Sequence, residues 1–181
     1  WVKEIDGWLT EMIRLEGRGN LHKDLCLRCH LNSARYHYED CMDLQLYCKT
    51  CVLDLHARLP FHRLQVWVKT HFERVTLKSM GLRIQLGHPI GVPCPNPSTA
   101  FGDDFILIDL TGIYEISIDF CDCESTLPHT KQLLRARIFP TTTIEPKTGA
   151  TFRILEHFHI ESAQAGTSVQ AFYNTLARCT D

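Results

Sequence analysis

The sequence predicts a zinc-stabilised α+β fold, and three observations lead to this expectation. The 181-residue chain carries nine cysteines, most of them in clusters with the spacing of metal ligands. Alternating apolar residues in the middle of the chain predict strands, and helical periodicity marks both ends. We therefore expect an interleaved two-zinc finger, then a small antiparallel β unit with its own zinc site, and finally C-terminal helices.

The overall charge and hydropathy narrow the functional classes. The formal net charge is -2, so the chain lacks the general basic field that is typical of nucleic-acid-binding proteins, and any basic patch must be local. No apolar run approaches the ~20 residues that span a bilayer, and we expect no membrane association. Because no signal-peptide pattern is present, the cysteines are expected to bind metal in a reducing compartment rather than to form disulfides.

Residues 1–19 are expected to form an N-terminal helix. Apolar residues from Val2 to Ile13 recur at helical spacing, and Gly17 and Gly19 end the pattern. We expect the apolar side of this helix to pack on the rest of the fold, with docking of a partner as the alternative.

The strongest metal signal lies in residues 20–64, the predicted zinc finger. Two C-x-x-C pairs about twenty residues apart are typical of one zinc site. The two residues inside each pair let a tight turn aim both sulfurs at one ion. The ligands of this first site are Cys26, Cys29, Cys48 and Cys51. Since so polar a segment cannot bury a large core, we expect metal binding to supply much of its folding energy.

A second site is expected to interleave with the first. Three of its ligands are Cys41, His56 and His62. His37 is the first choice for the fourth ligand, because a turn between it and Cys41 brings both to one ion; His30 and Asp40 are the weaker alternatives. Without a fourth ligand the position stays open, as in catalytic zinc sites. We favour the closed, structural site, because no general base stands out beside it.

Residues 65–140 are predicted to form the β unit. Extended segments at residues 64–77 and 82–86 precede a proline-rich loop, and residues 105–120 show the alternation of an antiparallel hairpin that ends at a C-x-C motif. Alternation points both sulfurs of this motif to the same side of the chain. If the neighbouring strand ends adjoin, the ligands of a third zinc site are His88, Cys94, Cys121 and Cys123.

The remainder of the chain is expected to close the fold. Residues 133–139 are predicted to be a strand with Arg135 and Arg137 on one face, where a pair of phosphate contacts is the less favoured interpretation. Residues 141–181 are predicted to hold two helices, one from Phe152 to Gly166 and one capped by Ser168.

Several of these motifs follow one another in a recognisable order. They are LEGRG at residues 15–19, the cluster at 26–62, LRIQLGHP at 82–89, CPNP at 94–97, DFCDC at 119–123 and LRAR at 134–137. Over nearly its whole length the chain resembles the CxC-like cysteine cluster (type 2) domain found next to fungal KDZ (Kyakuja–Dileera–Zisupton) transposases. The resemblance implies a nuclear, non-catalytic module that binds two to three Zn²⁺ ions and precedes a transposase core beyond Asp181.

One position departs from the family pattern. The family has a third C-x-x-C pair whose second member matches Cys41, whereas its first member falls on Tyr38, and tyrosine is a poor zinc ligand. Either His37 replaces the lost thiolate or the second site is weakened or empty. The cluster is also similar to ZZ-type and B-box fingers, which interleave two zinc ions and mostly bind proteins or peptides.

Two functions follow from these observations. In the favoured hypothesis the module helps a KDZ-type transposase to bind or target DNA, through basic residues that contact phosphate. Those residues in and before the finger are Arg14, Arg18, Lys23, Arg28, Arg35, Arg58 and Arg63. The alternative is a protein-interaction module that binds a chromatin protein, a histone tail or a transposase subunit without touching DNA. Its candidate contacts for a basic peptide are Asp40, Asp43 and Asp54.

An enzymatic function is not expected. The chain has no G-x-S-x-G, no H-E-x-x-H and no phosphate-binding glycine loop, and it lacks the deaminase pattern H-x-E…P-C-x-x-C. Candidates for an acidic metal site are Asp103, Asp104, Asp109 and Asp119. Their expected positions in turns and on an exposed hairpin face argue against that role.

Overall fold

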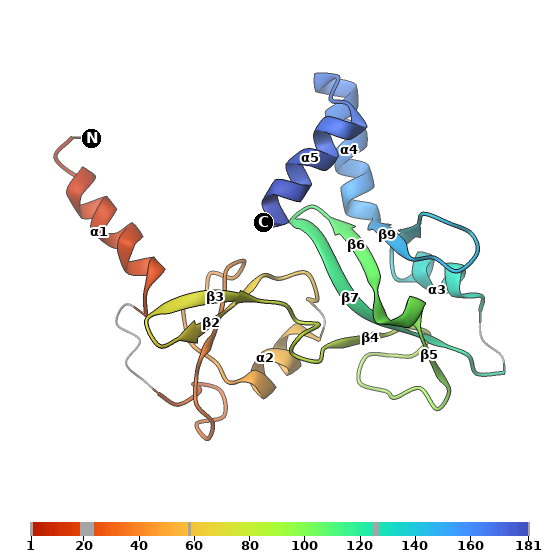
Figure 1. Cartoon of the computed structure of the whole chain (residues 1–181), viewed down its shortest axis with the longest axis horizontal. Coiled ribbons are helices and arrows are strands. Elements are labelled where there is room, and N and C mark those ends of the chain that lie inside the picture. Colours follow the sequence, from red (N-terminus) through yellow and green to blue (C-terminus); the bar gives the residue numbers. More distant parts are fainter. Residues whose placement is uncertain (1, 19–23, 58, 125–126, 181) are drawn as a thin grey trace. The chain divides into compact units, whose positions relative to one another are not determined.

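The computed structural model of the chain describes residues 2–18, 24–57, 59–124 and 127–180 (Figure 1). It combines helices and strands, which confirms the predicted α+β class. The chain divides into two compact units, Trp1–Gly81 and Leu82–Asp181. The division falls after residue 81 rather than after residue 64, because the strands that follow His62 pair back onto the finger.

The first unit begins with helix α1 (Ile5–Glu16), which exposes its apolar side. None of its described residues is buried, and Trp8 and Leu9 are each about half exposed. The expected packing of this helix on the fold is therefore not observed. The helix ends at Gly17, whose backbone is extended.

A small sheet and one short helix frame the finger. Strands β1 (Tyr36–Tyr38), β2 (Leu64–Val68) and β3 (His71–Val75) form an antiparallel sheet in that order, with Tyr38 opposite Leu64. Helix α2 (Lys49–His56) starts directly after Cys48. The buried core beside them is formed largely by thiols; its members are Cys26, Ala34, Leu46, Cys48 and Cys51. Because this core contains few apolar carbons, we expect the stability of the finger to depend on the metal that its sulfurs bind.

The second unit is built on one mixed sheet. Its strands are β4 (Arg83–Gln85), β5 (Pro97–Thr99), β6 (Phe105–Asp109), β7 (Gly112–Cys121), β8 (Ile138–Pro140) and β9 (Thr148–Thr151). The order is β4-β7-β6-β9-β8, and β5 also pairs with β7 (Figure 1). The predicted β6–β7 hairpin is confirmed as antiparallel. However, β4 runs parallel to β7 and β6 runs parallel to β9, because long connections separate the members of each pair in sequence.

Helices and one short turn complete the second unit. They are the 3₁₀ turn η1 (Ala100–Asp103) and helices α3 (His129–Arg135), α4 (Phe152–Ala165) and α5 (Val169–Thr180). The predicted cap of α5 is confirmed, since the Ala171 N–H donates to Ser168 Oγ at 3.2 Å. At its other end α5 returns to the hairpin, where Thr180 Oγ1 accepts from the Ile113 N–H at 2.8 Å.

The predicted strand at residues 133–139 is wrong in most of its length. Residues up to Arg135 form α3, Arg137 takes a left-handed turn with φ +60°, and only β8 is extended. The helix forms because Gln132 and Leu133 are both buried against the sheet, a tertiary contact that alternation in the sequence does not reveal. As a result Arg135 and Arg137 do not share one face of a strand.

Among the described residues no helix has both the length and the apolar character needed to cross a bilayer.

Candidate metal centres

The first cluster brings together the two C-x-x-C pairs. The sulfurs of Cys26, Cys29, Cys48 and Cys51 all lie within 4.8 Å of one another. A tight turn holds the first pair, because the His30 N–H donates to the Cys26 carbonyl at 2.8 Å. The second pair lies at the start of α2. All nine cysteines lie in the described residues and none forms a disulfide.

The backbone around the first cluster favours a thiolate. Burial of Cys26 opposes its ionisation, but N–H groups of Cys29 and Cys48 outweigh burial and lower its pKa to about 6. Burial and the neighbouring thiols instead raise the pKa of Cys51 to about 12. Without a cation, then, the four sulfurs cannot all be ionised together. A divalent cation of soft or borderline character removes this conflict, and a four-sulfur set suits Zn²⁺.

The third cluster gathers at the end of β7. One ligand atom each of His88, Cys94, Cys121 and Cys123 lies within 4.8 Å of the others. The His88 Nε2 atom is 3.3 Å from Cys121 Sγ, and Cys94 Sγ is 3.8 Å from Cys123 Sγ. The strand ends adjoin as expected, since β4 pairs with β7 directly before His88.

Gln132 holds the third cluster in place and was missed in the sequence. This buried residue accepts from the Cys121 N–H at 3.0 Å and donates to the Cys121 carbonyl at 2.8 Å. A second bond from its amide reaches the Leu127 carbonyl at 2.8 Å. Loss of an outer partner that orients a metal ligand typically lowers metal affinity by about 10- to 100-fold. Only a correct assignment of α3 as a helix would have pointed to Gln132.

The second cluster has three members. Cys41 Sγ lies 3.3 Å from His62 Nδ1, and His56 Nε2 lies 3.2 Å from the same nitrogen. All three ligand atoms lie within 4.8 Å of one another. Their two nitrogens and one sulfur also suit Zn²⁺, but a tetrahedral site needs a fourth donor.

The structure leaves His37, the first choice for that fourth donor, outside the cluster. In β1 the side chains alternate, and Tyr38 stacks on the His56 ring with centroids 4.1 Å apart. His37 therefore takes the other side of the strand, where its ring lies 5.2 Å from that of Phe72. Of the weaker choices, Asp40 is held by Arg63 through bonds of 2.6 and 2.7 Å, and exposed His30 does not join the described cluster.

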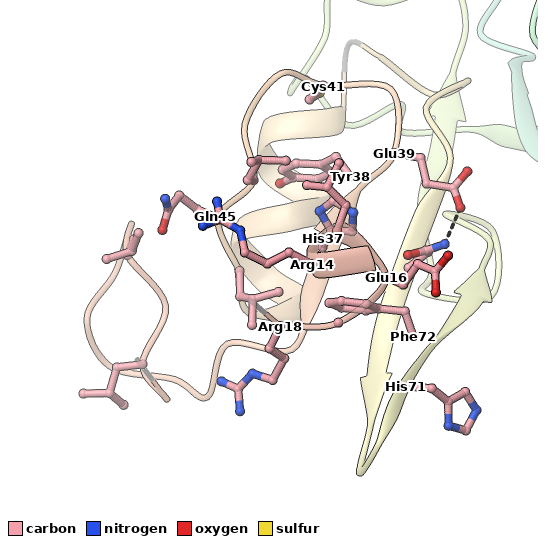
Figure 2. Close-up of a pocket in the computed structure, with 17 residues that line it drawn as sticks. Arg14, Glu16, Arg18, His37, Tyr38, Glu39, Cys41, Gln45, His71 and Phe72 are labelled. Carbon is pink, nitrogen blue, oxygen red and sulfur yellow. Dashed lines mark hydrogen bonds between the residues drawn. The ribbon is translucent and has the colours of Figure 1, made fainter. Parts of the chain in front are cut away.

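A pocket of about 820 Å³ lies in the first unit (Figure 2). Its lining residues include His37, Tyr38 and Phe72, and also Cys41 of the second cluster. Its charged lining residues are Arg14, Arg18, Glu16 and Glu39, which are balanced in sign. The pocket therefore favours a partly apolar occupant over a strongly charged one.

The acidic residues considered above stabilise the second unit instead of forming a site. Asp109 is fully buried and accepts hydrogen bonds from Thr151 and Arg153. Asp119 and Asp103 both pair with Arg83, at 2.6 and 2.9 Å. Among the described residues these carboxylates do not gather into a metal-binding group.

Together the clusters define a class: an α+β domain organised around cysteine and histidine groups whose donor sets suit zinc. The model of one family matches residues 77–181, and that family is described as a CxC2-like cysteine cluster associated with KDZ transposases. The chain belongs to this family. The matched residues contain the third cluster, whereas the finger lies outside them, so the family model covers less of the chain than the resemblance drawn from the motifs. No curated protein and no solved structure matches the chain.

Proposed function

We propose that the chain is a non-catalytic zinc-binding module of a nuclear KDZ-type transposase and that it contributes to DNA binding or targeting. Family membership supports the association with a transposase. The three clusters support the zinc sites, with two to three ions per chain as the expected content. The catalytic core is proposed to follow in the same polypeptide.

The basic residues of the first unit that were predicted to contact phosphate are poor candidates. Those of them that the structure describes have partners within the chain: Arg14 with Glu11, Arg18 with Asp24, Arg28 with Asp54, Arg35 with the Trp67 carbonyl, and Arg63 with Asp40. Lys23 and Arg58 lie outside the described residues. A phosphate would have to compete with these existing partners.

The observation that carries the proposal is a group of exposed cations in and just after α3. Lys131 and Arg135 are four residues apart on this helix, and Arg137 follows in the turn. In the described part of the chain, the side chains of these three residues form no ion pair or hydrogen bond. Their charges are therefore available to phosphate oxygens, the contacts that supply sequence-independent DNA affinity.

Salt dependence tests this proposal on the full, zinc-loaded chain. Each phosphate contact contributes about -0.9 to the slope of log affinity against log salt, so three contacts give roughly -2.7. The variant Lys131→Gln/Arg135→Gln/Arg137→Gln should lose most of this slope. A control with the same charge loss, Lys3→Gln/Lys49→Gln/Arg178→Gln, should keep it. Undetectable duplex binding at low salt, or equal slopes in both variants, would reject DNA contact at this surface.

The second candidate function is protein interaction without DNA contact, and the pocket of the first unit favours it. The acidic residues first considered for a basic peptide are occupied: Asp40 by Arg63, Asp43 by Tyr47, and Asp54 by Arg28. The pocket instead combines apolar lining residues with charged ones of both signs. A histone-peptide panel measured beside the DNA titration separates the two functions, and binding that Phe72→Ala abolishes would favour this one.

A further inference from the structure

The second cluster differs from the other two in the number of its ligands. The first and third clusters each assemble four ligand atoms, which fills a tetrahedron. Cys41, His56 and His62 assemble three, at separations of 3.2 to 3.9 Å. These separations suit ligand atoms around one ion, so the cluster is compact and short of one donor.

No described residue supplies that missing donor. Among the described residues no further histidine, cysteine, aspartate or glutamate joins the cluster. The place from which a donor is expected is Tyr38, because it stands three residues before Cys41 and so has the spacing of the two C-x-x-C pairs. Its ring is 2% exposed and stacks on His56, and its hydroxyl has no hydrogen-bond partner in the described part of the chain.

The cluster is also within reach of solutes. Cys41 and His62 are partly exposed, and Cys41 borders the pocket of about 820 Å³. An imidazole-sized molecule fits into a space of this volume. Zinc accepts nitrogen and sulfur donors readily, so such a molecule has the chemistry to complete the tetrahedron.

We propose that the ion held by Cys41, His56 and His62 keeps one exchangeable coordination position, which takes an exogenous imidazole or thiolate donor. This inference rests on the proposed zinc binding, because an empty cluster has no such position. It separates the chain's metal sites into two closed sites with a structural role and one open site that can bind a ligand.

Cobalt substitution of the full chain tests the inference, because the ligand-field bands of Co²⁺ report a change of ligand directly. Imidazole should shift the bands of one ion in three in the wild type. Tyr38→Cys introduces a thiolate at C-x-x-C spacing and should abolish the shift, whereas Tyr38→Ser leaves the same cavity without a strong ligand and should retain it. Since loss of an outer partner alone lowers metal affinity about 10- to 100-fold, Tyr38→Cys should also retain this ion at least about tenfold more tightly than Tyr38→Ser.

A measurement on the wild type keeps the inference testable if the variants fail to fold. X-ray absorption of the zinc-loaded chain should show additional outer-shell scattering from imidazole ring atoms after imidazole is added. Three bound ions with no response to imidazole would overturn the open position while leaving the proposed zinc module intact. Two bound ions, with the Cys41 cluster empty, would overturn it as well. A chain that binds no zinc would instead reject the proposed function itself.

Discussion

Gly87 lies directly against Cys121, so closely that a Cβ atom at Gly87 would be 2.5 Å from the Cys121 Cβ. The glycine also has φ +81°, a left-handed conformation that residues with a side chain adopt at a cost. It precedes His88, so one residue shapes the backbone of one ligand and leaves space for another. The third cluster therefore depends on a residue that is not itself a ligand.

The first prediction is that Gly87→Ala weakens the third zinc site. The added methyl group should push Cys121 away from His88 and lower the zinc content by one ion per chain, measured by metal analysis after dialysis. Gly91→Ala is the matched control, because Gly91 has φ +86° but no atom within 4 Å of its added Cβ. If both variants lose zinc equally, backbone strain rather than the contact with Cys121 determines the outcome, and if neither loses zinc the prediction is wrong.

Loss of one ligand should affect only the unit that contains it. Cys121→Ser should release one zinc ion and speed amide hydrogen exchange in residues 82–180, with little change in the finger. Cys26→Ser should do the reverse, because each cluster lies within a single compact unit. Hydrogen exchange measured by mass spectrometry on both variants checks this, and equal loosening of both units in either variant would show that they unfold as one body.

Tyr38→Phe should stabilise the zinc-loaded finger slightly. Its buried hydroxyl has no partner among the described residues, and an unsatisfied buried polar group costs about 1–3 kcal/mol, of which removal recovers part. Tyr47→Phe is the contrasting variant, since the Tyr47 hydroxyl donates to Asp43 and its removal should destabilise the finger. Denaturant unfolding of both variants should show a higher free energy of unfolding for Tyr38→Phe and a lower one for Tyr47→Phe. A loss of stability in Tyr38→Phe would contradict the prediction.

The Arg83–Asp119 pair should make the second unit sensitive to acid. The hydrogen bonds from Arg83 outweigh burial and hold the pKa of Asp119 below its usual value. The pair therefore stabilises the fold above about pH 4, the pKa range of an unfolded aspartate, and this contribution is lost as the pH falls through the lowered folded pKa. Because the Arg83 side chain is 39% exposed, we expect solvent to limit the contribution to about 1 kcal/mol.

Asp119→Asn provides the measurement. The difference in free energy of unfolding between wild type and variant should be constant above about pH 5 and shrink below about pH 4. Acid also releases zinc, but it does so in both proteins, so the difference isolates the carboxylate. A difference in free energy of unfolding that grows toward low pH would contradict the prediction.

Local spacing made two of the clusters predictable from the sequence. In the first cluster the ligands come in pairs two residues apart, and in the third a C-x-C motif ends a strand, so short-range geometry already aims the sulfurs. Nearness to Cys41 in the sequence predicts His37 as a ligand of the second cluster. The alternation of Tyr36, His37 and Tyr38 along β1 decides against it, since Tyr38 occupies the side that faces His56.

What could not be predicted depends on contacts between distant segments. Residues 129–135 form a helix because Gln132 bonds the backbone of Cys121 and Leu133 is fully buried, whereas the sequence pattern predicts a strand over residues 133–139. The parallel pairs of the second sheet join strands with long connections, and no local pattern records which strand will lie beside which. The predicted strand puts Arg135 and Arg137 on one face, whereas Arg135 ends α3 and Arg137 lies in the turn after it.

The pairing of β6 has a consequence during synthesis. One edge of β6 pairs with β7 across a short turn, and its other edge pairs with residues 148–150. This second edge stays unpaired during synthesis until residues 148–150 have left the ribosome, after α3 and β8. In the interval a row of unpaired amide and carbonyl groups is open to a strand from any neighbouring nascent chain. Aggregation of truncated products that end before residue 148 is the hazard that this connectivity creates.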